Sequence, residues 1–288
     1  MKRLAMLVVG LSLLTAVCAK GEASSLGPAP SGSSPSPTPG QSPSVGPSGS
    51  PSGTPSSSGR KLTFEVWFVR GGKLFLTKRT EPFNIAVGKL SLDTLAGGPS
   101  VPELEAQVQT ELPANATLAI TSLAGGNAMV DAGPAPMLEG GTPAVRLAKA
   151  QIVYTLTQYS TIRKVTFGGL AFSGDTNLYS RASFDDLLPA IVVESPVIGQ
   201  RIANPVTVSG TANVFEATVS LRILDENGKA VANTFTTATC GTGCRGDYSV
   251  SIPYSVDHEQ QGTVEVYESS AKDGSAINVV DIPVSLTP

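Results

Sequence analysis

A long stretch of Ser, Pro and Gly limits where this chain can fold. Between Leu26 and Gly59, 28 of the 34 residues are of these three types. A segment of that composition buries too little apolar surface to offset the entropy of ordering its backbone. We therefore expect residues 18–60 to be a disordered linker that starts at a cysteine, with folded structure beginning near residue 61.

The first residues carry the pattern of an export signal. Lys2 and Arg3 precede the apolar run Leu4–Val17. This run is shorter than the roughly 20 residues that a transmembrane helix needs, so we predict that residues 1–17 are a signal peptide. Its removal would leave 18 basic and 23 acidic residues. A net negative chain without a basic stripe argues against a nucleic-acid partner.

The apolar run ends at Cys18 in the sequence LTAVC, which resembles the lipobox of bacterial lipoproteins. Val17 stands where Gly or Ala is usual, and ordinary signal-peptidase cleavage after Ala19 is the alternative. Cys240 and Cys244 are close neighbours, which leaves Cys18 as the odd thiol, and acylation would explain it. We predict a lipid anchor at Cys18, and hence a protein on the outer face of the cell membrane.

Residues 61–187 begin with two predicted hairpins. KLTFEVWFVRGGKLFLTKR alternates apolar and polar residues around the turn Gly71-Gly72, and TLAITSLAGGNAMVDAG has the same design. In the first hairpin Trp67 lies on the face opposite to the apolar set. That face is either exposed to solvent or a second buried face.

Two helices and a final strand complete the predicted α+β domain. Ile85, Leu92 and Leu95 recur at near-helical spacing before a Gly-Gly stop. TPAVRLAKAQIVYTLTQYS starts with a Thr142 cap and Pro143, and the strand KVTFGG follows it. We expect a mixed sheet with helices on one side.

Three blocks of this domain resemble, in order, the GerMN domain. They are VWFVRGGKLFLTKR, LPANATLAITSLAGGNAMVDAG and AQIVYTLTQYSTIRKVTF, and Gln151–Gln158 is the most specific part. The GerMN family occurs in sporulation and spore-germination proteins and in many cell-surface lipoproteins, including those of non-sporulating bacteria. The resemblance therefore implies an envelope protein, and it brings no catalytic residue to this chain.

Residues 188–288 have strand patterns at short, regular spacing. About seven such runs, with a hairpin signal at Asn227-Gly228, predict an antiparallel β-sandwich. VVESPVIGQRIANPVTVSGTANVFEATVSLRILDENG resembles the immunoglobulin-like domain that often follows GerMN in germination-related proteins. We interpret its characteristic residues as turns, a close backbone approach and a core aromatic. They are Pro196, Gly199, Pro205, Gly210, Phe215 and Glu216.

The two predicted domains meet in the sequence SFDDLLP. Ser183 followed by Asp186 predicts a capped short helix, and Pro189 would end it. Each side has its own strands and apolar residues. We therefore expect fragments 60–188 and 189–288 to fold independently, unless a large apolar interface joins them.

The pair Cys240-Gly-Thr-Gly-Cys244 is either a disulfide or half of a metal site. Zinc needs four ligands, and the chain offers one such pair and a single histidine, His258. Export favours the disulfide, which would lock a glycine-rich hairpin tip. His258 lies between Asp257 and Glu259, and we interpret it as an exposed loop residue.

The sequence contains no nucleophile elbow, no His-Glu-x-x-His and no Walker loop. We therefore predict no catalytic residue, metal or cofactor, and the sequence does not identify binding residues. The basic cluster Arg70, Lys73, Lys78 and Arg79 is interpreted as a solvated face. The predicted function is a non-catalytic, membrane-anchored surface lipoprotein that binds envelope proteins or cell-wall polymer. The alternative is an envelope hydrolase or a carrier of a small molecule or glycan.

Overall fold

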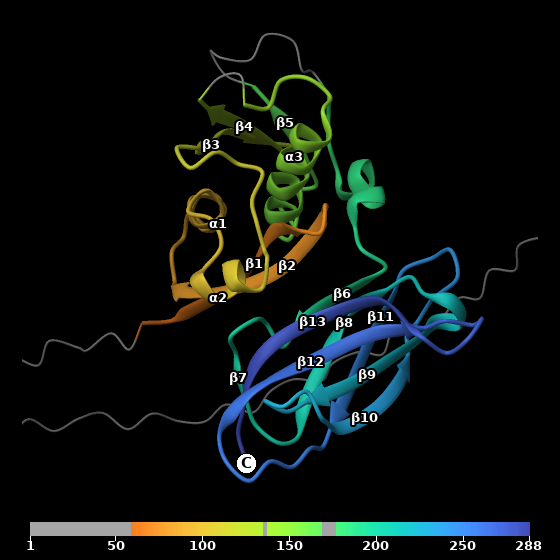
Figure 1. The fold of residues 1–288 in the computed structure, drawn as a ribbon. Coiled ribbons are helices and arrows are strands. Elements are labelled where there is room, and N and C mark those ends of the chain that lie inside the picture. Colours follow the sequence, from red (N-terminus) through yellow and green to blue (C-terminus); the bar gives the residue numbers. More distant parts are fainter. Residues whose placement is uncertain (1–58, 135–136, 169–176) are drawn as a thin grey trace, which may run out of the picture. The chain divides into compact units, whose positions relative to one another are not determined.

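The computed structural model describes residues 59–134, 137–168 and 177–288. The predicted signal peptide, the anchor Cys18 and nearly all of the predicted linker lie outside these residues. All described residues belong to one compact unit. In it an α+β domain precedes an all-β domain, which confirms the fold class expected from the sequence (Figure 1).

The α+β domain is built from two hairpins, three helices and a last strand. These elements are β1 (Lys61–Arg70), β2 (Lys73–Pro82), α1 (Val87–Ala96), α2 (Val101–Glu105), β3 (Thr117–Ala124), β4 (Asn127–Gly133), α3 (Pro143–Leu156) and β5 (Lys164–Phe167).

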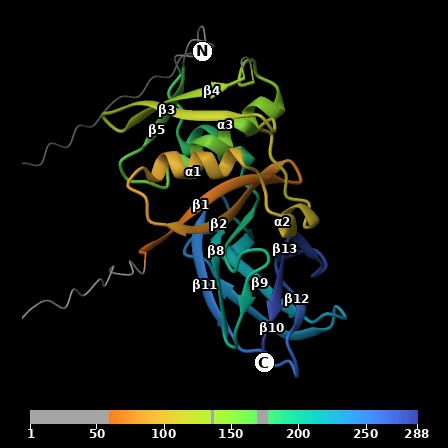
Figure 2. The same cartoon turned by 90° about the vertical axis from the view of Figure 1, so that its left-hand side faces the viewer.

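Both predicted hairpins are confirmed. β1 pairs with β2 through Gly71 and Gly72, whose positive φ angles suit glycine. β3 pairs with β4, and β5 adds to β4 in parallel, so this second sheet is mixed. Helices α1 and α3 lie between the mixed sheet and the β1–β2 ribbon (Figure 2). Each sheet therefore has helices on one face.

Helix α3 begins where the sequence predicts. The Thr142 hydroxyl accepts a hydrogen bond from the Val145 amide at 3.3 Å, and Pro143 is the first helical residue. All side chains from Leu147 to Leu156 are buried. The helix is therefore covered on every side, and not only along one apolar face, because it lies between two sheets.

The structure shows whether Trp67 and Ile85 are buried, which the apolar pattern left open for Trp67 and predicted incorrectly for Ile85. Trp67 is only 3% exposed, so both faces of β1 are buried. Ile85 is 91% exposed, and its assignment to the apolar face of a helix was wrong. Helix α1 starts only at Val87. The Asn84 side chain accepts a hydrogen bond from the Ala86 amide at 2.9 Å, and this bond forms a local turn in place of a first helical turn.

The all-β domain is a sandwich of a five-stranded and a three-stranded sheet. In chain order its elements are β6 (Ile191–Ser195), β7 (Arg201–Ile202), β8 (Val206–Ala212), the 3₁₀ turn η2 (Phe215–Ala217), β9 (Thr218–Leu224), β10 (Ala230–Thr237), β11 (Gly246–Ile252), β12 (Gln260–Ser269) and β13 (Ala276–Leu286). The sheet orders are β10-β9-β12-β13-β7 and β11-β8-β6. The β9–β10 hairpin at Asn227-Gly228 is confirmed.

The helix at the junction differs from its prediction. It is a 3₁₀ turn, η1 (Arg181–Leu187), and Ser180 rather than Ser183 is its N-cap residue. The Ser180 amide donates to the Ser183 hydroxyl at 3.1 Å. Asp186 plays no capping role, because its carboxylate accepts two hydrogen bonds of 3.0 Å from Arg146.

Among the residues interpreted as structural in the all-β domain, the two glycines have structural roles and Phe215 does not lie in the core. Gly199 has a positive φ angle, and a Cβ at Gly210 would collide with the main-chain oxygen of Val192 on the neighbouring strand. Phe215, however, is 50% exposed. The interpretation of Phe215 as a core aromatic was wrong, because it lies in η2, outside the two sheets.

Candidate functional site

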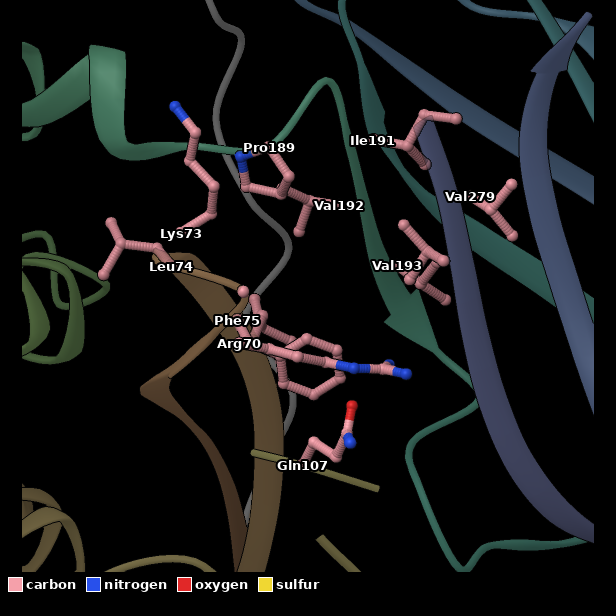
Figure 3. Close-up of a pocket in the computed structure, with 13 residues that line it drawn as sticks. Arg70, Lys73, Leu74, Phe75, Gln107, Pro189, Ile191, Val192, Val193 and Val279 are labelled. Carbon is pink, nitrogen blue, oxygen red and sulfur yellow. The ribbon is translucent and has the colours of Figure 1, made fainter. Parts of the chain in front are cut away.

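The described residues form a pocket of about 280 Å³ where the two domains meet (Figure 3). Strand β2 contributes Phe75, β6 contributes Ile191 and Val193, and β13 contributes Val279. The volume lies just below the range of about 300–1,000 Å³ for ligand pockets. The wall is therefore mainly apolar, with room for a small molecule.

Two cations flank the β1–β2 turn at this pocket. The Arg70 guanidinium lies 5.5 Å from the centre of the Phe75 ring and donates to the main-chain oxygen of Asp281 on β13 at 2.7 Å. Lys73 donates to the main-chain oxygen of Asp186 at 2.7 Å. No acidic side chain is among the described residues that line the pocket. The lining therefore carries two positive charges and no negative one.

These contacts correct the interpretation of a solvated face for Arg70 and Arg79, whereas Lys73 is exposed as interpreted. Arg70 reaches the all-β domain, as Figure 3 shows, and Lys73 reaches the junction. Arg79 pairs with Glu103. Arg70 and Lys73 reach these partners because the hairpin tip packs against the second domain, which no pattern within the hairpin reveals.

Helix α2 holds the remaining polar residue of the pocket, Gln107, in place. Glu103 on this helix is 1% exposed and accepts hydrogen bonds from Arg79 at 2.8 Å and from Thr77 at 2.6 Å. Burial alone would raise the pKa of Glu103, but the hydrogen bonds from Arg79 and Thr77 hold this pKa below its usual value. The ion pair between Arg79 and Glu103 fixes α2 to β2. Gln107 comes two residues after α2 and has a positive φ angle of 64°.

Two polar side chains of α3 and one from the residues just after it fix the position of β1. Gln151 donates to the Trp67 main-chain oxygen, and the Trp67 amide donates to the Thr155 hydroxyl, both at 3.1 Å. Gln158 accepts from the Glu65 amide at 2.7 Å and donates to the Glu65 oxygen at 2.8 Å. The outer edge of β1 thus pairs with a helix instead of a strand. Polar residues at i and i+4 in the buried helix, and at i+7 just past its end, were a signal in the sequence for these contacts.

An arginine of the second domain holds the segment that connects the domains. Arg245 donates to the main-chain oxygens of Pro189 at 2.5 Å, Ala190 at 3.4 Å and Thr211 at 3.3 Å. Burial lowers the pKa of Arg245, and the nearby Tyr154 and Asp185 act in the opposite direction. The residues directly before β6, of which Pro189 lines the pocket, are therefore tied to the sandwich.

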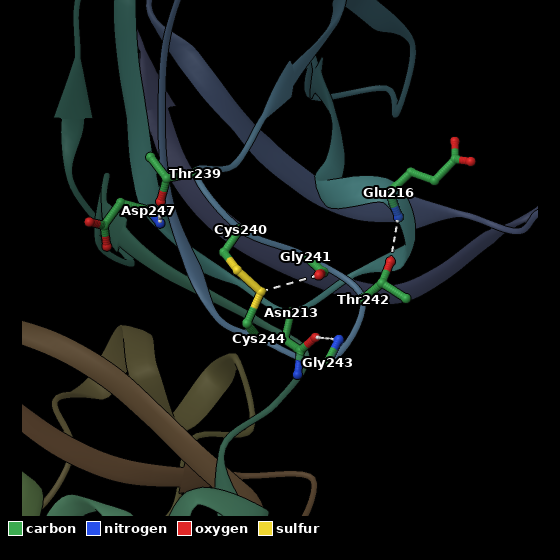
Figure 4. Close-up of a disulfide and its surroundings, with 9 residues drawn as sticks. All are labelled: Asn213, Glu216, Thr239, Cys240, Gly241, Thr242, Gly243, Cys244 and Asp247. Carbon is green, nitrogen blue, oxygen red and sulfur yellow. Dashed lines mark hydrogen bonds between the residues drawn. A yellow bond between two sulfur atoms is a disulfide. The ribbon is translucent and has the colours of Figure 1, made fainter. Parts of the chain in front are cut away.

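Cys240 and Cys244 form a disulfide, with Cα atoms 5.7 Å apart, directly before Arg245 (Figure 4). It does not lock a hairpin tip, as the sequence suggested. β10 pairs with β9 and β11 pairs with β8, so the disulfide loop crosses from one sheet to the other. In this loop the Thr242 hydroxyl accepts a hydrogen bond from the Glu216 amide at 2.9 Å. The Glu216 carboxylate points away from the loop.

His258 is an exposed loop residue, as interpreted. Its Nδ1 lies 2.6 Å from Asp257, and its Nε2 lies 3.5 Å from Glu226. The hydrogen bond from His258 lowers the pKa of Asp257. In the described part of the chain, no group of three or more His, Cys, Asp or Glu residues is placed to hold a metal ion. No helix within residues 59–134, 137–168 and 177–288 is long and apolar enough to cross a membrane.

Two family models match the chain. Residues 73–168 match the family described as sporulation and spore germination, and residues 190–275 match the immunoglobulin-like domain of bacterial spore germination. The chain therefore contains a match to each of these two domain types, one after the other. The pocket draws on both, because Phe75 and Gln107 belong to the GerMN domain and Ile191 and Val193 belong to the immunoglobulin-like domain.

Solved structures of related domains are only distantly similar. The tandem GerMN domains of the sporulation protein GerM from Bacillus subtilis share 15% identity over 79% of this chain, with a TM-score of 0.35, and the chain spans 61% of that structure's length. The first GerMN domain of the same protein shares 23% identity over 42% of this chain and 98% of its own, with a TM-score of 0.32.

A putative lipoprotein from Clostridium perfringens shares 12% identity over 44% of this chain and 93% of its own, with a TM-score of 0.30. At these TM-scores the similarities add nothing to the geometry described above. A search of curated proteins found no match.

Proposed function

We propose that this chain is a non-catalytic surface lipoprotein that binds or organises components of the cell envelope. In this proposal Cys18 anchors it to the outer face of the membrane, and its partners are envelope proteins or cell-wall polymer. One observation carries the proposal: a tandem of two germination-type domains follows a lipobox-like cysteine and a Ser/Pro/Gly-rich segment. The domain types favour a role in sporulation, germination or a related wall process.

The predicted linker would let the folded domains extend away from the anchored cysteine. Between Cys18 and β1 lie about 40 residues, which as a flexible coil would span roughly 35 Å. The folded domains would then stand away from the membrane, within reach of wall components.

The anchor is tested by exchanging Cys18. We expect the wild type to enter the detergent phase in a detergent-partition assay, and Cys18→Ala to stay in the aqueous phase or to be processed incorrectly. Stable retention requires more than one acyl chain, because a single chain binds only marginally. The double variant Cys240→Ala/Cys244→Ala is the control, since it removes thiols but leaves the anchor. Equal partitioning of wild type and Cys18→Ala would refute the anchor and favour cleavage after Ala19.

A second candidate function is that of a small-molecule carrier. The pocket with Arg70 and Lys73 favours it, whereas no arrangement in the described residues favours an envelope hydrolase. Carrier and anchored binding protein are compatible, because the pocket and the predicted anchor lie in different parts of the chain.

A further inference from the structure

We infer that the pocket between the two domains binds a small anion with an apolar body, such as an apolar carboxylate or phosphate, through Arg70 and Lys73. This inference deepens the proposed function, because it names the chemical class of one ligand. It goes beyond the family matches, which assign no ligand to either domain.

The apolar part of the pocket comes from both domains. Ile191 and Val193 on β6 and Phe75 on β2 are nearly or fully buried, whereas Val279 on β13 is 43% exposed. In Figure 3 these side chains surround a common space between the strands. A ligand in that space would cover Val279 and remove apolar surface from water, which favours binding of an apolar group.

The charged part comes from the ends of β1 and β2. Arg70 uses one of its N–H groups for Asp281 and keeps the others for a ligand. The Asp186 carboxylate, which lies near Lys73, is already neutralised by Arg146, whose hydrogen bonds lower the pKa of Asp186. Two cations without an acid in the lining complement a negative charge.

The geometry selects a carboxylate or phosphate over a neutral ligand. Guanidinium groups bind such anions with paired hydrogen bonds, and the Phe75 ring beneath Arg70 restricts how that side chain can move. Gln107 offers a neutral amide at the same wall. The volume of about 280 Å³ restricts the apolar body to a short chain or a single ring.

Calorimetric titration of the purified full chain tests this inference with four eight-carbon probes. Octanoate and octyl phosphate should each bind at least about tenfold more tightly than octanol, because each gains charge-assisted hydrogen bonds. Octylammonium should not bind. The tighter of the two anions identifies the preferred head group.

Variants separate the charges from the fold. Arg70→Gln and Lys73→Gln should each weaken octanoate binding about tenfold and leave octanol binding unchanged. Lys89→Gln is the control, because Lys89 pairs with Asp93 on the exposed side of α1. Lys73→Gln keeps the test valid if Arg70→Gln disturbs the contact with Asp281.

Equal binding of octanoate and octanol, or no binding of either anion, would overturn the inference. So would an unchanged octanoate affinity in both pocket variants. The titration involves no membrane, so its failure would leave the anchor at Cys18 and the binding of envelope partners untouched.

Discussion

At the scale of single residues, buried polar side chains decide how the first domain holds its shape. Gln151 is fully buried, and its amide contacts the Trp67 oxygen, the Thr110 hydroxyl and the Glu111 amide. Such a residue joins β1, α3 and the segment before β3 without any apolar contribution. Gln151 stabilises the domain because its hydrogen bonds satisfy backbone groups that would otherwise be unpaired.

Replacement of Gln151 by Leu should lower the free energy of unfolding by about 3 kcal/mol, because the buried main-chain oxygen of Trp67 and the part-buried amide of Glu111 lose their partners. The control is Gln261→Leu, since the exposed Gln261 bonds only to Ser285 on the neighbouring strand. The control should change stability by less than about 0.5 kcal/mol. Urea unfolding followed by circular dichroism, which reports on both domains, measures both, and equal effects would refute the role given to Gln151.

Glu103 should make stability depend on pH. Its pKa is lowered in the folded protein, so its contribution is present above the pKa of the unfolded chain and is lost as the pH falls through the folded value. Glu103→Gln should destabilise by about 3 kcal/mol at pH 7, because Arg79 loses its buried partner. The difference from wild type should shrink below about pH 4. A difference in urea unfolding that stays constant from pH 7 to pH 3 would contradict this assignment.

At the scale of elements, local patterns predicted most of the fold. Alternation around Gly-Gly or Asn-Gly identified the hairpins, and the cap at Thr142 placed the start of α3, because these signals act within a few residues. The errors arose where tertiary packing decides. Phe215 looks like a core residue but lies outside the sheets, and the disulfide loop looks like a hairpin tip but joins two sheets.

The pocket could not be predicted from the sequence for the same reason. The hydrogen bond from Arg70 to Asp281 joins residues 211 positions apart. No local pattern carries that information. The basic residues were visible in the sequence, but their partners were not.

The loop that contains the disulfide should stabilise the connection between the domains through Arg245. Arg245→Met removes the donors to Pro189 and Ala190, and we expect a loss of about 2 kcal/mol and faster hydrogen exchange in peptides covering residues 190–195. Arg201→Met is the control, because Arg201 makes only an exposed pair with Glu259 and should matter little. If both variants changed exchange equally, or neither did, Arg245 would not hold the connection.

At the scale of the whole molecule, the order of the two domains creates a feature that neither has alone. The α+β domain supplies the cations of the pocket and the all-β domain supplies much of its apolar wall. The independent folding of fragments 60–188 and 189–288 remains a prediction. Even if both fragments fold, we expect the pocket to exist only in the joined chain.

The most direct test of the account is photo-cross-linking in membranes of the native host. An aliphatic residue with a diazirine group would replace either Val279 at the pocket or Phe235, which is 70% exposed on β10. Strands β9 and β12 separate β10 from β13, so Phe235 is a control on the same sheet. We predict an envelope component attached at position 279, absent at position 235, and reduced by Lys73→Gln and by Cys18→Ala. Identical products at both positions, or none at position 279, would contradict an anchored protein that binds its ligand between the two domains.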